Sequence, residues 1–163
     1  MKNGKLYKVN LIERFQVIVD TREQTPWRFT NEVIETVPAG DYTVGLLFEN
    51  IVIKMDKVFA IERKSAVGEL YAASGLERDR FIAELEKLDK LQFKFVICEF
   101  SFSDIQDNPP PGKVSADVVY GSILSWTIKY NIPFLFFGNR KFARMGAWKL
   151  MSFFIKQTVL GER

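Results

Sequence analysis

Two short apolar runs that end in charged residues constrain the fold of this chain more than any other feature. FQVIVD (15–20) and VFAIERK (58–64) are rich in β-branched and aromatic residues, which favour β-strands. Charged side chains are seldom buried unless they are paired or functional. We therefore expect two central strands of a sheet, each with polar groups at its C-terminal tip.

The rest of the sequence alternates between strand and helix patterns. The clearest helix is expected at 76–91, where Phe81, Leu85 and Leu88 recur at helical spacing. The other expected elements are a hairpin (42–48 and 51–55), strands at 93–100 and 132–137, a long loop at 101–113, a helix that Ser115 caps and that reaches Tyr130, and a helix at 140–157. This order predicts an α/β fold with a mixed central β-sheet flanked by helices.

Composition limits the domain organisation and the compartment. The 163 residues, 47% of them hydrophobic, fit one globular domain. We expect an N-terminal arm at 1–14 and a single domain at 15–163. The first residues lack an apolar signal core, and no stretch approaches the roughly 18 apolar residues of a membrane span. We therefore expect a soluble, intracellular protein that does not contact a membrane.

The chain contains no histidine and one cysteine, Cys98. This composition excludes histidine-based catalytic triads, zinc sites with histidine ligands and a disulfide within the chain. The 23 Lys and Arg against 20 Asp and Glu give a net charge of +3, which suits a nucleic-acid partner without establishing one. Hydrolytic chemistry must therefore use carboxylates, Lys, Arg or a hard metal ion.

The charged residues at the strand tips are candidates for one site. Strand alternation places Glu62 and Lys64 on one side of the sheet and Arg63 on the other. If the strand tips meet, the carboxylates of Asp20 and Asp41 converge with that of Glu62. Two carboxylates about 4 Å apart repel by roughly 4 kcal/mol at an effective dielectric constant near 20, so a proton or a cation must relieve them. Oxygen ligands favour Mg²⁺ or Mn²⁺.

Each of these residues alone is more often a surface ion pair or a turn residue, but their joint occurrence at strand ends favours a site. A divalent ion there can polarise a phosphoryl oxygen and lower the pKa of a bound water. Lys64 could orient that water or help to deprotonate it, while Arg22 and Arg63 could hold phosphate oxygens. This assembly suits phosphodiester hydrolysis.

The motifs VDTRE (19–23), GDY (40–42) and ERKS (62–65), in this order, resemble the nuclease domain of the XPF-type structure-specific endonucleases, within the restriction-endonuclease-like fold. The similarity extends over about residues 15–157. It implies that Asp20, Asp41 and Glu62 serve a Mg²⁺ or Mn²⁺ ion. It also implies that Arg22, Glu23, Arg63 and Lys64 complete the catalytic set.

The sequence departs from this family pattern in three ways. The family usually carries an aspartate four positions after the ERK lysine, where this chain has Gly68 followed by Glu69. The connection between Asp41 and Glu62 is longer than in many relatives. The paired helix-hairpin-helix module, a helicase sequence and a P-loop are all missing, so we expect no ATP.

The resemblance implies a metal-dependent DNA endonuclease that acts on branched, flap or fork structures. Candidate phosphate contacts are Arg140, Lys141, Arg144 and Lys113. DNA is the expected partner, and a homodimer or heterodimer could form through the nuclease domain. One alternative is a catalytically weak or inactive DNA-binding scaffold subunit, which Gly68 favours. Another is a restriction or resolvase-like enzyme on the same fold.

Overall fold

One mixed β-sheet organises the chain in the computed structural model, which describes residues 15–48, 51–159 and 161. Within these residues seven strands follow the order β2-β1-β3-β5-β6-β7, with β4 paired to β3. The strands are β1 (Phe15–Asp20), β2 (Glu32–Glu35), β3 (Tyr42–Phe48), β4 (Ile51–Lys54), β5 (Phe59–Lys64), β6 (Phe93–Cys98) and β7 (Phe134–Phe136). The helices are α1 (Val67–Ser74), α2 (Arg78–Asp89), α3 (Asp104–Asp107), α4 (Ala116–Tyr130) and α5 (Arg140–Phe154), and a π-helical turn, η2 (Ile155–Val159), follows α5.

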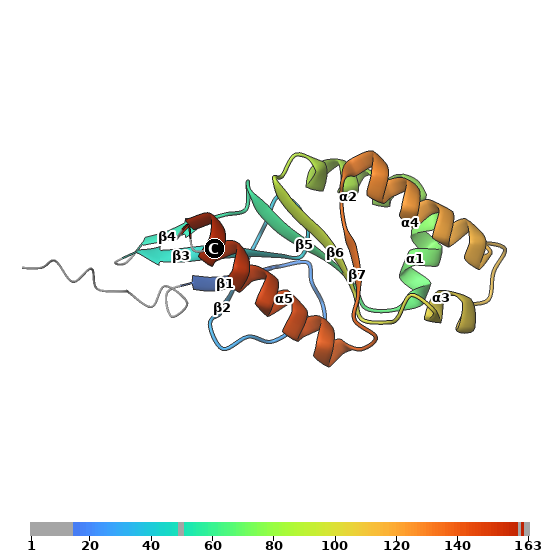
Figure 1. Cartoon of the computed structure of the whole chain (residues 1–163), viewed down its shortest axis with the longest axis horizontal. Helices are drawn as coiled ribbons and strands as arrows, with labels where there is room; N and C mark the ends of the chain where they lie inside the picture. The colour runs from blue at the N-terminus through green and yellow to red at the C-terminus, as the bar shows by residue number, and fades with distance from the viewer. Residues whose placement is uncertain (1–14, 49–50, 160, 162–163) are drawn as a thin grey trace, which may run out of the picture.

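The sheet is antiparallel in its centre and parallel toward both edges. Strand β3 pairs antiparallel with β1 and β5, whereas β1 with β2, β5 with β6, and β6 with β7 are parallel pairs. Helices α1 to α4 lie on one side of the sheet and α5 lies on the other (Figure 1). The predicted α/β fold, with a mixed sheet flanked by helices, is confirmed.

The alternation of side chains along the strands divides the interior into two cores. Ala60 and Val96 face the core under α1, α2 and α4, whereas Ile61 and Ile97 face the core under α5. Trp27 is fully buried in the second core, where its ring stacks on Tyr42 at a centroid distance of 4.8 Å. The two faces of β5 therefore present different chemical surroundings to the charged residues at its end.

Three elements were not predicted from the sequence. Strand β2 has four residues, none of them fully buried, and pairs at the sheet edge. Helix α3 is a single turn within the predicted long loop. Helix α1 begins after Ala66, which has no capping side chain; instead, Glu69 Oε1 accepts hydrogen bonds from the backbone amides of Ser65 (2.8 Å) and Ala66 (3.1 Å). The cap is therefore a residue inside the helix, which sequence patterns seldom reveal.

The other predicted elements are found with small changes at their ends. Ser115 Oγ accepts a hydrogen bond from the Val118 amide (3.4 Å) and caps α4 as predicted. The predicted arm at 1–14 lies outside the described residues, so the domain boundary stays a prediction. No described helix has both the length and the apolar character that crossing a membrane requires.

Gly40 fixes the turn that delivers the chain into β3. Its φ is +72°, and a Cβ at this position would lie 2.8 Å from the Ile61 carbonyl oxygen. This close approach lets the Asp41 amide donate to that same carbonyl at 2.8 Å. Glycine is therefore required here both by the backbone conformation and by the contact with β5.

We expect Gly40→Ala to lower the free energy of unfolding by about 2 kcal/mol or more, because it adds a strained φ and a backbone clash. For a chain of this size the melting temperature would fall by about 4–8 °C. Gly68→Ala is the matched control, since a Cβ at Gly68 has no neighbour within 4 Å. Equal melting temperatures for the two variants would contradict this account of the turn.

Candidate active site

Three neighbouring strand ends bring the predicted acidic residues to one edge of the sheet. Asp20 ends β1, Asp41 immediately precedes β3, and Glu62 lies near the end of β5. The Asp20 amide donates to the Asp41 carbonyl (2.8 Å), and the Asp41 amide donates to the Ile61 carbonyl (2.8 Å). These bonds extend the sheet to its tip and fix the three residues side by side.

A polar hollow of about 410 Å³ opens at this edge, and we call it the catalytic hollow. It collects most of the residues that the sequence singled out, although they come from four separate segments. Its lining consists of Arg22, Glu23, Gln24, Thr25, Asp41, Glu62, Arg63, Lys64, Ser65, Glu69 and Arg80.

Asp41 and Glu62 form a buried pair of like charges. Burial raises the pKa of the Asp41 carboxyl well above its usual range, and the nearby Glu62 carboxylate raises it further. One stabilising contact opposes this, because the Arg63 amide donates to Asp41 Oδ2 at 2.7 Å. The pair therefore has a strong tendency to take up a proton or a cation.

Lys64 partly neutralises this pair from the same side of β5. Its Nζ donates to Glu62 Oε1 at 2.8 Å and lies 4.5 Å from the centroid of the Phe81 ring. Burial lowers the pKa of Lys64, but the Glu62 carboxylate outweighs this effect and the net pKa is raised. Lys64 is therefore an ammonium ion at neutral pH, which suits orienting a water more than removing its proton.

Arg63 points to the opposite face of β5, as strand alternation predicted, and two carboxylates fix it there. Its Nε donates to Glu99 Oε1 (2.7 Å) and its Nη1 donates to Glu23 Oε1 (3.1 Å). The guanidinium also lies 5.5 Å from the centroid of the Trp27 ring, and only 4% of the side chain is exposed. Among the described residues Nη2 has no hydrogen-bond partner.

Glu99 was not predicted, although it connects more of this site than any other acid. Its Oε1 accepts from Trp27 Nε1 (2.5 Å), Arg63 Nε (2.7 Å) and Arg140 Nη1 (3.2 Å). The sequence signal was present, because Glu99 directly follows the buried strand β6 just as the ERK charges end β5. Glu99 is best described as a positioning residue for Arg63.

Asp20 is not drawn into the Asp41 and Glu62 pair. Its carboxylate accepts from the Arg22 amide (2.8 Å), Arg22 Nε (2.6 Å), Arg22 Nη2 (3.2 Å) and the Val37 amide (2.8 Å). Burial raises the pKa of Asp20, but these donors outweigh burial and the net pKa is lowered. In this structure Asp20 orients Arg22, whose side chain is 59% exposed.

The donor set can be compared with the needs of a hard metal ion. Across residues 15–48, 51–159 and 161, no three His, Cys, Asp or Glu side chains are arranged to hold a metal. Asp41 and Glu62 are nevertheless two adjacent oxygen donors, and Mg²⁺ is commonly held by one or two carboxylates together with substrate phosphates. The pair therefore fits such an ion, while a ligand role for Asp20 stays a prediction.

The Glu69 carboxylate, which lines the catalytic hollow, is engaged at the start of α1. Its Oε1 accepts from Ser65 Oγ (2.6 Å) as well as from the two amides that cap α1. The Gly68 position itself is open, because a side chain there would meet nothing within 4 Å of its Cβ. The chain therefore has room for a carboxylate at position 68.

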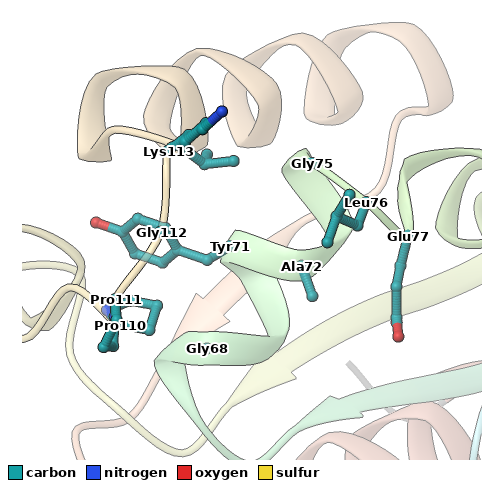
Figure 2. Close-up of a pocket in the computed structure, with 11 residues that line it drawn as sticks. Gly68, Tyr71, Ala72, Gly75, Leu76, Glu77, Pro110, Pro111, Gly112 and Lys113 are labelled. Atoms are coloured by element: carbon teal, nitrogen blue, oxygen red, sulfur yellow. The ribbon is translucent and has the colours of Figure 1, made fainter.

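A larger cavity lies away from these groups. It measures about 490 Å³ and lies between α1 and the loop at 110–114, with Tyr71, Pro110 and Pro111 on its wall (Figure 2). Tyr71 is held by its hydroxyl, which donates to the Ile105 carbonyl at 2.7 Å. The lining is mainly apolar and contains neither acid of the central pair, so this cavity is not the site of the predicted chemistry.

The four predicted phosphate contacts have different surroundings. Lys113 lines the apolar cavity on the α1 side of the sheet (Figure 2). Arg140 is engaged with Glu99 and donates to the carbonyls of Thr25 (3.0 Å) and Pro26 (2.8 Å). Lys141 and Arg144 line a smaller cavity beside α5.

Comparisons with known proteins agree on the fold. A family model described as the ERCC4 domain matches residues 19–144. XPF from Aeropyrum pernix aligns over 91% of this chain and 64% of its own, with a TM-score of 0.67 and 17% sequence identity. XPF from Aeropyrum pernix in complex with DNA aligns over 88% and 66%, with a TM-score of 0.62 and 20% identity. No curated protein matches the sequence. The chain thus spans less than two thirds of either solved chain.

We expect Asp41→Asn to stabilise the metal-free protein at neutral pH. When the pKa of a carboxyl group is higher in the folded protein than in the unfolded chain, the folded protein becomes less stable as pH rises. The loss begins at the unfolded pKa, about 3.9, and continues through the folded pKa. Removing the charge should raise the melting temperature at pH 7 by about 2–4 °C, which is about 1 kcal/mol. The gain should vanish near pH 3.5. Melting curves from pH 3.5 to 8 in chelator measure it, and a pH-independent difference would contradict it.

We expect Glu99→Gln to remove one of the two carboxylates that hold Arg63 while preserving the shape of the side chain at position 99. Removing one partner of a buried ion pair should cost about 3 kcal/mol of stability. Thermal unfolding measures this cost. Glu86→Gln, an exposed change on α2, is the control. If both variants unfold at the same temperature, the Glu99 network does not stabilise the site.

Proposed function

The chain belongs to the ERCC4 domain family, and from this premise we propose that it is a divalent-metal-dependent DNA endonuclease. The resemblance inferred from VDTRE, GDY and ERKS is confirmed by the family match and by the shared fold. The observation that carries the proposal is the buried pair of Asp41 and Glu62, with Lys64 on one side and Arg63 on the other.

Each group has a role that follows from its contacts. Asp41 and Glu62 would hold Mg²⁺ or Mn²⁺, an ion that supplies charge stabilisation of the phosphoryl group and a more acidic water. The Lys64 ammonium positions the attacking water next to this pair. Arg63 Nη2 and the exposed Arg22 guanidinium offer donors to non-bridging phosphate oxygens.

The remaining acids support these roles. Asp20 aligns Arg22 through the Nε and amide contacts, and we retain its proposed role as a metal ligand for the loaded enzyme. Glu23 and Glu99 hold Arg63 from two sides. Arg63 would otherwise be a buried cation without a counter-charge, which is costly.

The proposed substrates are branched, flap or fork DNA structures, as the resemblance to XPF-type enzymes implies. Of the solved chains, one is XPF in complex with DNA. Because this chain spans less than two thirds of that protein, substrate and partners are proposals for the chain itself. Lys141 and Arg144, with no carboxylate in the cavity that they line, support an interaction with phosphates.

We also propose association with a second nuclease domain, of the same or another chain. Helix α4 supports this, because Leu124 and Ile128 are exposed on it while Trp126 is buried in the core. An exposed apolar helix face is a common feature of association surfaces. The surface proposed for association is therefore formed by Leu124 and Ile128, whereas Trp126 belongs to the core.

A DNA-binding scaffold without strong catalysis is the second candidate. Two observations favour it: Gly68 offers no carboxylate, and the described residues assemble a pair of acids rather than a group of three. The endonuclease is favoured because the pair, the ammonium and the guanidinium are all present and ordered.

We expect cleavage of a flap substrate with Mg²⁺ or Mn²⁺ and none in chelator. Glu62→Gln should reduce the rate at least about 100-fold, because it removes a donor that stabilises charge in the transition state. Glu86→Gln, exposed on α2, should cleave like the natural chain. Gly68→Asp should increase the rate, because it restores an acid where space is open. A natural chain that binds DNA without cutting any of fork, flap, single-stranded and duplex DNA would support the scaffold.

A further inference from the structure

A second cavity with cationic lining lies beside α5, outside the catalytic hollow. The cavity has a volume of about 360 Å³ and is lined by Phe29, Thr30, Lys141, Arg144, Met145 and Trp148. Its lining therefore combines two cations with two aromatic rings and contains no carboxylate. We infer that this cavity binds one unpaired nucleotide of the DNA strand, with its base against the aromatic rings and its phosphate near the two cations.

The cations of this cavity are suited to an anion. Arg144 Nε donates to the Arg28 carbonyl at 2.6 Å, and its guanidinium lies 5.5 Å from the centroid of the Phe29 ring. These contacts hold the guanidinium in place, and in the described part of the chain its Nη1 and Nη2 have no hydrogen-bond partner. Glu32 is already engaged by Arg28 Nη1 and the Phe29 amide, both at 2.8 Å. Burial raises the pKa of Glu32, but these two donors and the charges of Arg28 and Arg144 outweigh burial and lower it. The charge of Arg144 thus stays available for phosphate, with exposed Lys141 beside it.

The aromatic wall is preformed. The rings of Phe29 and Trp148 stack at a centroid distance of 5.9 Å with an interplanar angle of 23°. Trp148 also packs on Phe15 at 4.8 Å, which fixes its orientation, yet it remains partly exposed. Stacking of a base on such rings is tolerant of sequence and contributes substantially to single-strand binding.

An unpaired nucleotide fits this lining better than a duplex or an acidic peptide does. In a duplex the base faces are covered by neighbouring pairs, and only the backbone would meet the cavity. An acidic peptide would satisfy Lys141 and Arg144 but would gain nothing specific from Phe29 and Trp148. Phe29 is buried and supports Trp148 from behind, so the partly exposed Trp148 ring beside the two cations is the surface that an unpaired base would use.

The cavity is tied to the catalytic hollow by Arg140. This residue precedes Lys141, and its guanidinium contacts Glu99 and the carbonyls of Thr25 and Pro26. Thr25 lines the catalytic hollow, and Glu99 holds Arg63. The inference rests on the proposed action on DNA and adds a place beside α5 where one unpaired nucleotide is held.

The test measures binding in chelator, where no cleavage occurs, by fluorescence anisotropy of labelled DNA. The probe is a duplex with a five-nucleotide thymidine overhang, and the matched probe has the same overhang with abasic positions. The natural chain should bind the thymidine overhang about tenfold more tightly than the abasic overhang. Lys141→Gln and Arg144→Gln should weaken binding of both probes and together reduce the salt slope by about 1.4. Lys149→Gln, an exposed change on the same helix, should alter neither.

A separate readout uses the tryptophans. Trp27 and Trp126 are buried, so quenching of fluorescence by an oligothymidylate should come from Trp148 and should be lost in Trp148→Leu. If Trp148→Leu fails to fold, the comparison of the two overhangs with the natural chain still decides the question.

Three results would overturn the inference: equal affinity for the two overhangs, no difference between Lys141→Gln and Lys149→Gln, or equal competition by a poly-glutamate of matched charge. The last would assign the cavity to an acidic protein partner. Cleavage is measured separately with Mg²⁺. If the chain cleaves DNA but binds the two overhangs equally, the nucleotide site is wrong and the proposed nuclease function stands. If it prefers the overhang with bases but cleaves no substrate, the nucleotide site stands and the nuclease function is wrong.

Discussion

The proximity of the Asp41 and Glu62 carboxylates, through which Glu62 raises the pKa of Asp41, is the constraint on which the rest of the site depends. Two like charges at neighbouring strand ends are unfavourable in the folded protein without a counter-ion. Their position is nevertheless fixed by backbone hydrogen bonds between β1, β3 and β5 and by the glycine turn before Asp41. The fold thus maintains a charge arrangement that costs stability, which is common where chemistry requires it.

Strand alternation then distributes the cations. Lys64 falls on the side of Glu62 and α2, and Arg63 falls on the side of Trp27 and α5. Each cation is buried and each has at least one carboxylate partner, so the edge of the sheet is an ordered ionic network rather than a set of surface charges. The network also explains why residues from distant segments of the chain must fold together before any site exists.

The sequence predicted the parts of this arrangement that depend on local patterns. Alternation in FAIERK predicted the opposite directions of Glu62 and Arg63, and apolar spacing predicted the helix that supplies Phe81. The sequence patterns did not predict the residues that complete this network. Glu99 was missed because its importance arises only when β6 lies parallel to β5. Asp20 lies beside Asp41 as expected, but a strand pattern does not reveal that Arg22 folds back onto the Asp20 carboxylate. The capping of α1 by Glu69 was hidden for the same reason, since the signal lies inside the helix.

The tether formed by Arg140 has a geometric consequence. It joins the start of α5 to the loop at Thr25 and Pro26 and to Glu99, so direct hydrogen bonds link the segment beside the aromatic cavity to the edge of the catalytic hollow. If the chain cuts DNA as proposed, this link would set the number of nucleotides between the bound unpaired base and the incision, whatever bases those nucleotides carry.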